Sequence, residues 1–435
     1  MARQTAAPSE APITGRRSAH LRNHNLSSIA KTVILAPTAP SRSEVATTTG
    51  LNRSTVSRLV DDLIEFGILA EGDSDLVASG GRPRTPLFGA RRTHVSIGIE
   101  IGQTFVDLIL LDLHGSTLVH LQRELALSTL APAEVFDIIG TLLSELLEQI
   151  IATHMSLAGI TVGLPGLIDK STHHLVVSPN FNWRDFNLSS FFRKGLPPQA
   201  ASRIGEVPVR FENSASLSAF NELVEMNRNA MPYEDFLLVT GTTGIGSCLV
   251  RNHAPVEGTH GWAGELGHAF VAEGNRPCSC GSTGCLESFA ACEPLMEAAG
   301  LSPSDPIAHL VSQLRRHDKQ AVSTVDNAAR LLGRALGSYI NLVDIQHIVL
   351  GGIPRILYEQ MPSTIEMELK QRVLSYSSRP TEFSTADSLE NSVVRGAAWR
   401  SLIDFIEEPS WWVAPSEFAR NHKSLDSTKE ISLEL

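Results

Sequence analysis

The sequence predicts an α/β protein made of a helical head and a larger body of two similar lobes. Residues 19–70 are helix-patterned and poor in glycine. From Thr93 onward, strands rich in β-branched residues alternate with long helices, as in residues 132–155, which is typical of α/β domains. Segments 93–112 and 236–252 each contain an apolar strand, a glycine-rich turn and a second apolar strand. This internal echo indicates two related lobes with a cleft between them.

Length and composition restrict the class of protein. A chain of 435 residues is long enough for two or three domains, and its apolar (42%) and charged (19%) fractions are ordinary for a globular protein. No apolar run reaches the ~18 residues of a membrane span, and the N-terminus lacks the apolar core of a secretory signal. The odd count of five cysteines in such a chain favours a reducing cytoplasm and metal chemistry over disulfides.

The charge is distributed unevenly. The net charge is −11, yet the first 92 residues hold 12 Lys or Arg against 8 Asp or Glu. A basic head on an acidic body indicates nucleic-acid contact confined to one end. We therefore expect a disordered leader over 1–18, a winged helix-turn-helix over 19–92, an α/β body over 93–405 and a tail over 406–435.

Residues 41–69 have the spacing of a helix-turn-helix. We expect Ser43 to cap the first helix, Gly50 to form the turn and Asn52 to cap a second helix that runs from Arg53 to about Phe66. The polar face of this second helix would enter a major groove of DNA. Its predicted DNA contacts are Ser54, Thr55, Ser57 and Arg58, in addition to Ser43, Asn52 and Arg53.

A wing is expected after the second helix, which ends at Gly67. Residues 68–72 and 82–89 can pair as two strands, and the Gly-flanked Arg82-Pro83-Arg84 suits insertion into a minor groove. The alternative is a three-helix packing element with an exposed, hydroxyl-rich helix. Agreement between the helix spacing, the wing and the basic head favours DNA binding.

A metal site is predicted in residues 264–287. His268, Cys278, Cys280 and Cys285 supply one imidazole and three thiolates, which is a tetrahedral zinc set. Four protein ligands close the coordination sphere, so we expect one structural zinc ion per chain. The alternative is four scattered buried residues. Cys248 and Cys292 lie outside the motif and are expected to be small buried side chains.

With these motifs in place, the chain resembles the ROK family of repressors and sugar kinases over about residues 20–405. GWAGELGH and CSCGSTGCLE carry the resemblance, and VGLPGLID, FENS, TGTTGIG and IVLGG follow in the family's order. The resemblance implies a two-lobed, actin-like (ribonuclease-H-like) domain of the sugar-kinase type, with sugar bound between the lobes. The sugar contacts that it implies are Gly163, Pro165, Gly166, Asn213, Glu265, His268 and Glu287. Outside the family context, Asn213, Glu265 and Glu287 would be interpreted as solvated or capping residues.

Three positions depart from the kinases that the family contains. Kinases have Asn-Asp where this chain has Asn213-Ser214, and serine cannot act as the general base near neutral pH. They have Asp-x-Gly-Gly-Thr where this chain has Glu100-Ile-Gly102-Gln103-Thr104, so Gln103 puts a side chain where nucleotide phosphates would approach the backbone. The second loop, 241–246, is one residue longer.

These departures predict a DNA-binding regulator without catalytic residues. It would form a homodimer or homotetramer on symmetric half-sites and respond to a sugar or sugar phosphate in the cleft. One alternative is an active sugar kinase with a dual role. Another is a regulator controlled by a protein partner, in which the sugar cleft is vestigial.

Overall fold

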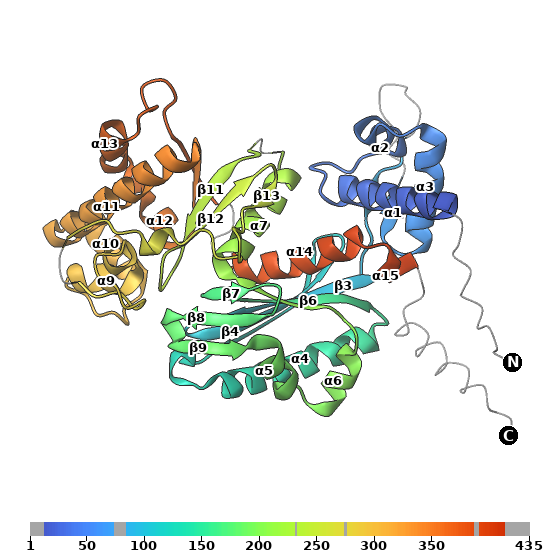
Figure 1. The fold of residues 1–435 in the computed structure, drawn as a ribbon, viewed down its shortest axis with the longest axis horizontal. Helices are drawn as coiled ribbons and strands as arrows, with labels where there is room; N and C mark the ends of the chain where they lie inside the picture. The colour runs from blue at the N-terminus through green and yellow to red at the C-terminus, as the bar shows by residue number, and fades with distance from the viewer. Residues whose placement is uncertain (1–12, 74–83, 231–232, 274–275, 387–390, 414–435) are drawn as a thin grey trace, which may run out of the picture.

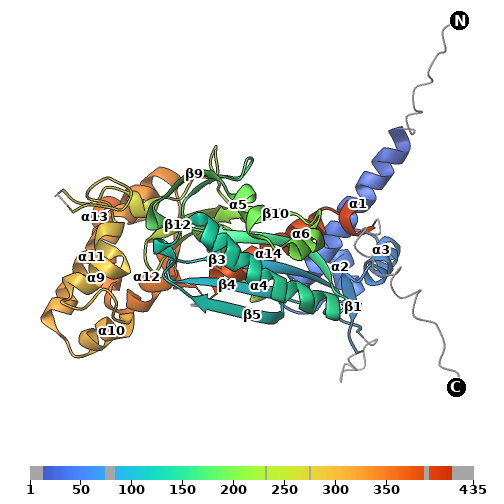
Figure 2. The same ribbon diagram turned by 90° about the horizontal axis from the view of Figure 1, so that it is seen from below.

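The computed structural model describes residues 13–73, 84–230, 233–273, 276–386 and 391–413. These residues form a head and two lobes that follow one another along the long axis of the molecule (Figures 1 and 2). Within the described residues, no helix is long and apolar enough to cross a membrane.

The head is a three-helix unit with a two-stranded antiparallel wing. Its elements are α1 (Ile13–Ile34), α2 (Arg42–Thr49), α3 (Arg53–Glu65), β1 (Leu69–Glu71) and β2 (Leu87–Gly89). Asn52 caps α3 and Gly50 has a φ of 69°, as the sequence predicts. Since α1 begins at Ile13, the residues 13–18 that we expected in a disordered leader belong to a helix.

The cap of α2 is Ser41, so the prediction of Ser43 is wrong. The Ser41 hydroxyl accepts a hydrogen bond from Glu44 N, and the Glu44 carboxylate accepts one from Ser41 N. This reciprocal pairing requires a serine three residues before the glutamate. Ser43 is instead an exposed residue of the first helical turn.

The first lobe is built on a mixed five-stranded sheet of order β10-β6-β3-β4-β5. Its strands are β3 (His94–Ile101), β4 (Phe105–Asp112), β5 (Thr117–Glu124), β6 (Ser156–Leu164) and β10 (Val209–Asn213). The helices α4 (Pro132–Ala152), α5 (Leu188–Gly195) and α6 (Pro198–Ile204) cover one face of the lobe. A small sheet follows β6, formed by β7 (Leu167–Asp169), β8 (His174–Ser178) and β9 (Trp183–Asn187).

The second lobe repeats this plan with the sheet order β13-β12-β11-β14-β15. Its strands are β11 (Phe236–Thr240), β12 (Gly246–Arg251), β13 (Ala254–Pro255), β14 (His347–Leu350) and β15 (Glu382–Thr385). The outer helices are α8 (Glu287–Ala290), α9 (Cys292–Ala298), α10 (Ile307–Arg315), α11 (Lys319–Val343), α12 (Gly352–Leu357) and α13 (Pro362–Arg372). In each sheet an antiparallel meander is followed by two parallel strands, which confirms the duplicated architecture.

Two helices lie between the sheets. Helix α14 (Ser392–Glu407) packs on the first sheet, and α7 (Ser214–Arg228) lies between α14 and the second sheet. The order of layers is therefore helices, sheet, α14, α7, sheet, helices, which is the actin-like arrangement expected for the body.

The head is packed directly onto the first lobe. Ser27 Oγ donates a hydrogen bond to Ile406 O at the end of α14, and the Lys31 ammonium lies 2.6 Å from the Glu407 carboxylate. Helix α15 (Ser410–Val413) brings the buried Trp412 against the Phe66 ring, at 5.7 Å between ring centroids. Residues 406–413, which we expected in a polar tail, thus belong to the fold and share one hydrophobic core with the head and α14.

We predict that Trp412→Ala destabilises the head. Loss of the buried indole, and of its hydrogen bond to Phe405 O, should lower the free energy of unfolding by about 3 kcal/mol. Its neighbour Trp411 is 38% exposed, so Trp411→Ala should change stability by less than about 0.5 kcal/mol. Urea unfolding followed by circular dichroism measures both variants. If both variants lose the same free energy of unfolding, Trp412 has no packing role beyond that of Trp411.

Candidate functional site

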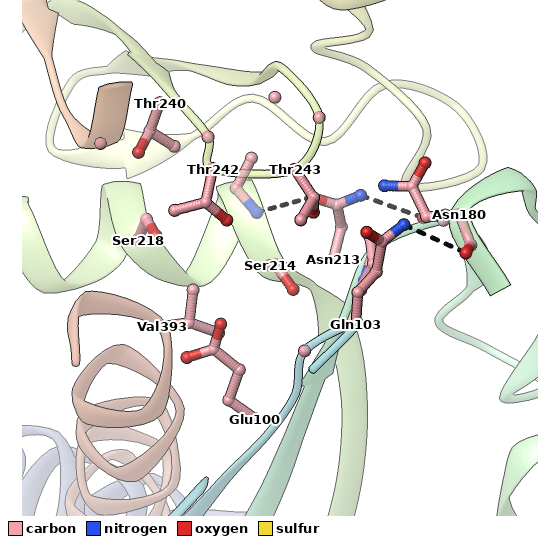
Figure 3. Close-up of a pocket in the computed structure, with 18 of the residues that line it drawn as sticks. Glu100, Gln103, Asn180, Asn213, Ser214, Ser218, Thr240, Thr242, Thr243 and Val393 are labelled. Carbon is pink, nitrogen blue, oxygen red and sulfur yellow. Dashed lines mark hydrogen bonds between the residues drawn. The ribbon is translucent and has the colours of Figure 1, made fainter. Parts of the chain in front are cut away.

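A cavity of about 780 Å³ lies between the two lobes. The turn after β3 and the loop 241–246 after β11 face each other across it, and the start of α7 and the start of α14 form further parts of its wall (Figure 3). The two glycine-rich turns that the sequence singles out therefore meet at one site, because each ends an equivalent strand of a duplicated lobe.

Six of the seven predicted sugar contacts line this cavity. They are Pro165, Gly166, Asn213, Glu265, His268 and Glu287. Gly163 does not line it, because it is the eighth residue of β6 and a side chain there would collide with Leu217 and Val393. The glycine is needed for close packing under the cavity wall, so its assignment to the ligand loop is wrong.

Two hydrogen bonds hold the Asn213 side chain in place. As the last residue of β10 and the cap of α7, it accepts a hydrogen bond from Ala215 N at 2.8 Å. Its side-chain amide donates to Gly166 O at 3.0 Å and so holds the Pro165–Gly166 loop against the start of α7. The capping interpretation of this residue is correct, and the same contacts fix it in the cavity wall.

Glu265, His268 and Glu287 converge from the second lobe. Glu265 immediately precedes the 3-10 turn η3 (Leu266–His268), and Glu287 begins α8. His268 Nε2 lies 3.9 Å from Glu265 Oε2, and the Glu287 carboxylate accepts a hydrogen bond from Ile245 N at 2.9 Å. Two carboxylates and an imidazole are thus held at one side of the cavity, where they can hydrogen-bond to hydroxyl groups.

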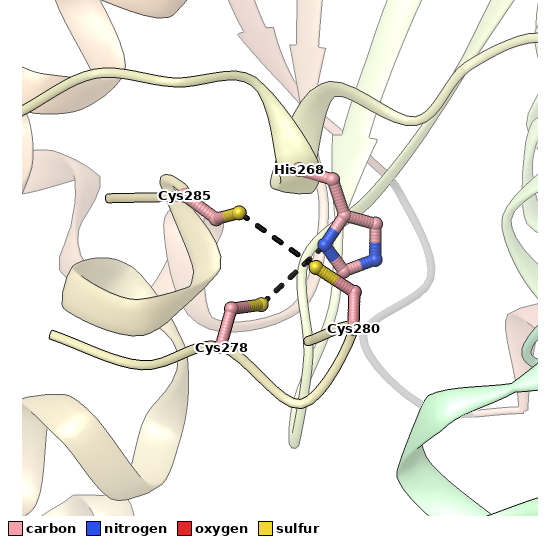
Figure 4. A group of neighbouring side chains, drawn as sticks. All are labelled: His268, Cys278, Cys280 and Cys285. Carbon is pink, nitrogen blue, oxygen red and sulfur yellow. Dashed lines mark hydrogen bonds between the residues drawn. The ribbon is translucent and has the colours of Figure 1, made fainter. Parts of the chain in front are cut away.

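The four predicted metal ligands form a cluster beside this group (Figure 4). Their donor atoms all lie within 4.8 Å of one another. Cys278 Sγ is 3.6 Å from His268 Nδ1, and Cys280 Sγ is 3.9 Å from Cys285 Sγ. A tetrahedral ion with metal–sulfur bonds of about 2.3 Å places its ligands about 3.8 Å apart. The donor set and its spacing therefore suit a metal ion, and the second ring nitrogen of His268 remains turned toward Glu265.

Ser214, which we expected at the position of the kinase base, is the first residue of α7. Its hydroxyl lies in the cavity wall and is buried without a hydrogen-bond partner among the described residues (Figure 3). Gln103, at the turn after β3, donates a hydrogen bond to Asn180 O at 3.1 Å. The Gln103 side chain thus links the turn after β3 to the segment before β9.

Two acidic side chains of the first sheet face the cavity, although the sequence did not predict that they lie together there. Glu100 on β3 and Asp107 on β4 line it, and Asp107 is paired with His120 of β5 at 2.6 Å. Burial, and secondarily the Asp107 carboxylate, raise the pKa of Glu100 to about 8. The pairing of β3 with β4 could have revealed them, because Glu100 lies directly opposite Asp107 in the register.

Most of the residues predicted to contact DNA lie at the start of α3. Asn52, Arg53, Ser54 and Arg58 are exposed, whereas Thr55 and Ser57 are half-buried. Asn52 Oδ1 accepts hydrogen bonds from Thr55 N and Ser54 Oγ, both at 2.8 Å. Two exposed arginines at the open end of a capped helix form a surface suited to nucleic acid.

The structure describes one of the two arginines that we predicted in the wing. Arg82 lies outside the described residues. Arg84 donates to Ala39 O and pairs with Glu44 at 2.8 Å, so its guanidinium is engaged within the head. Its contact with DNA stays a prediction.

Both the head and the two-lobed body of the chain match known protein families. An IclR helix-turn-helix domain matches residues 34–72, and the ROK family matches residues 96–402. The xylose repressor of Bacillus subtilis (strain 168) is 28% identical over 381 residues, covering 86% of this chain and 94% of that protein. A glucokinase of Halalkalibacterium halodurans is 26% identical over 330 residues, covering 70% of this chain and 93% of that protein.

Among solved structures, a ROK family transcriptional regulator described as a homologue of the E. coli MLC protein has the same fold. Its TM-score is 0.70 at 19% identity, and the match covers 89% of this chain and 98% of that one. The family match extends over more than half of the chain and includes both lobes, the cavity and the Cys/His cluster. This protein therefore belongs to the ROK family and carries an N-terminal helix-turn-helix.

Proposed function

We propose that the protein is a DNA-binding transcriptional repressor that releases its operator when a sugar binds between the lobes. One observation carries the proposal: the helix-turn-helix is packed on a lobe whose cavity keeps the sugar-facing residues Asn213, Glu265 and Glu287 but has Ser214 in place of the base. A repressor relative that spans nearly the whole chain supports this function.

The reading surface supports contact with a major groove. α3 presents Arg53 and Arg58, which form no ion pair among the described residues. Arginine recognises guanine edges and phosphates, and the exposed Ser54 can add a phosphate contact. In a homodimer or homotetramer, two such helices would read symmetric half-sites. We place the protein in the cytoplasm, where the operator is.

Helix α14 offers a route from the cavity to the head. Its first residues, Ser392 and Val393, line the cavity, and its last turn contacts α1 through Ile406 and Glu407. Closure of the lobes on a ligand would move the start of α14 and, with it, the head. Such control requires that the ligand bind the closed form more tightly than the open form.

We expect specific binding to DNA from upstream of the protein's own gene, weakened by one sugar of a test panel. Fluorescence anisotropy against a scrambled duplex measures both effects. Arg58→Ala should weaken operator binding about tenfold or more, whereas Arg123→Ala, on the exposed strand β5 far from α3, should leave it unchanged. Specific binding that no sugar alters would favour control by a protein partner.

Because the chain is also similar to a glucokinase, an active sugar kinase is the second candidate function. Ser214 cannot accept the proton of a sugar hydroxyl, and loss of a general base typically costs ~10²–10⁴-fold in rate. We expect no ATP-dependent phosphorylation of hexoses, pentoses or amino sugars in a coupled assay, with a ROK glucokinase as the positive control. Stoichiometric conversion of any of them to its phosphate would establish the kinase.

We further propose that the Cys/His cluster holds one structural zinc ion per chain. Bound at His268 Nδ1, the ion would fix the ring so that Nε2 faces Glu265 and the sugar. Elemental analysis should find about one zinc per chain, and Cys280→Ser should lose the ion and lower thermal stability. Cys292→Ser, which alters a thiol outside the cluster, should keep it. A metal-free wild-type protein of unchanged stability would contradict this assignment.

A further inference from the structure

A lysine of the first lobe pairs with two acidic residues, one from each lobe. Lys170 follows β7 in a turn that Asp169 holds, since the Asp169 carboxylate accepts a hydrogen bond from Ser171 N at 2.9 Å. The Lys170 ammonium lies 2.9 Å from the carboxylate of Glu212 on β10 and 2.6 Å from that of Glu257. Glu257 follows β13 in the second lobe, so Lys170 joins the two lobes at a point outside the cavity lining.

A buried cluster of charges fixes this link on the side of the first lobe. Glu212 is 6% exposed, and Nε of Arg400 on α14 lies 3.3 Å from its carboxylate. Arg400 also lies 3.6 Å from Asp404, which pairs with Arg210 at 2.6 Å. Glu212 therefore lies between two cations, as a buried carboxylate requires, and gives Lys170 a fixed partner within the first lobe.

On the side of the second lobe, the link reaches a loop that its own lobe holds at both ends. Residues 256–264 follow β13 and contain neither helix nor strand. Val256 N donates a hydrogen bond to Leu249 O at one end, and Ser247 Oγ donates one to Gly264 O at the other. A loop anchored in this way needs a further contact to fix its middle.

The middle of the 256–264 loop lies against Lys170. Gly261 has a φ of 84°, and a Cβ atom there would lie 3.3 Å from Lys170 Cγ and 3.4 Å from Ile168 O. The loop thus packs on the aliphatic stem of Lys170, while the ammonium group pairs with Glu257. Both contacts hold the loop against the first lobe, and Glu265 follows the loop directly.

The pair with Glu257 is better suited to positioning the loop than to stabilising the fold. The Glu257 side chain is 43% exposed, and an ion pair with so exposed a partner contributes little to stability. A loop that is already held, however, does not have to be ordered when a ligand contacts Glu265. Such preorganisation removes part of the entropic cost of binding.

We infer that Lys170 is a positioning residue for the sugar site: by pairing with Glu257 across the lobes, it holds the 256–264 loop so that Glu265 faces the cavity. The inference rests on the sugar-responsive function proposed above and adds to it a residue outside the cavity. Lys170 acts through the loop and touches no ligand in this role. Its loss should therefore lower the affinity for sugar and leave the affinity for DNA in the absence of sugar unchanged.

The test measures sugar binding by the full-length protein. Isothermal titration calorimetry with glucose, xylose and N-acetylglucosamine identifies which of them binds the wild-type protein. For that sugar, Glu257→Gln and Lys170→Met should each raise the dissociation constant about three- to tenfold, because the loop must then be ordered on binding. Glu257→Gln leaves the pair of Lys170 with Glu212 intact, so it answers the question if the methionine variant does not fold.

Further variants separate the ion pair from a general effect on folding. Glu148→Gln breaks an exposed pair with Arg203, between α4 and α6, and should leave sugar binding unchanged. Lys170→Arg keeps the cation and should bind sugar nearly as tightly as the wild-type protein. The double variant Lys170→Met/Glu257→Gln should bind no more weakly than the weaker single variant, because one ion pair cannot be broken twice.

Hydrogen–deuterium exchange reports the loop itself. Without sugar, the backbone amides of residues 256–264 should exchange faster in Glu257→Gln than in the wild-type protein, because the middle of the loop is released. Glu148→Gln should leave their exchange unchanged. Fluorescence anisotropy without sugar should give the same operator affinity for both variants.

The outcomes separate this inference from the proposed function. Sugar binding by Glu257→Gln at the wild-type affinity would overturn the inference and leave the sugar-responsive function intact. Additive losses in the double variant, or a loss in Lys170→Arg as large as that in Lys170→Met, would overturn it in the same way. If none of the three sugars binds the wild-type protein, the proposed function itself fails, and the inference fails with it.

Discussion

The close packing of helix α14 is the constraint on which the rest of the structure depends. A Cβ atom on Gly98 would lie 2.0 Å from Val394 O, and one on Gly396 would lie 2.0 Å from Leu217 O. Two glycines therefore let α14 approach both the first sheet and α7 more closely than any side chain would allow. Without that approach the layers between the lobes would separate, the cavity would lose one wall, and the head would lose the surface on which it is packed.

This packing gives the cavity and the head a common rigid element. α14 has 16 residues, so it is about 24 Å long. Its buried face is held along its length, as shown by the hydrogen bond from Ser96 Oγ to Ala398 O and by that between Thr161 Oγ1 and Ser401 Oγ. A helix held in this way moves with the first sheet as one body. The proposed effector would therefore act on the head by changing the angle between the lobes rather than by deforming the helix.

Patterns among neighbouring residues predicted the main helices and strands. They failed for residues whose role depends on contacts with distant parts of the chain. The duplicated hairpins, the N-cap of α3 and the Cys/His cluster follow from patterns of a few neighbouring residues. Gly163 was misassigned because its glycine serves a contact with Leu217, far along the chain. The packing of Trp412 against the distant Phe66 could not be predicted from neighbouring residues, and neither could the raised pKa of Glu100, which comes from burial and from the strand beside it.

The proposed combination of sugar-facing residues and a missing base suits a sensor for a physical reason. Binding needs hydrogen-bond partners held in place, and Asn213, Glu265 and His268 offer such groups in the cavity wall. Phosphoryl transfer also needs a proton acceptor, and a serine such as Ser214 cannot act as one near neutral pH. A protein that converted its effector would release a charged product and reset itself. One that only binds stays in the ligand-bound form for as long as the sugar is present, so its occupancy follows the sugar concentration.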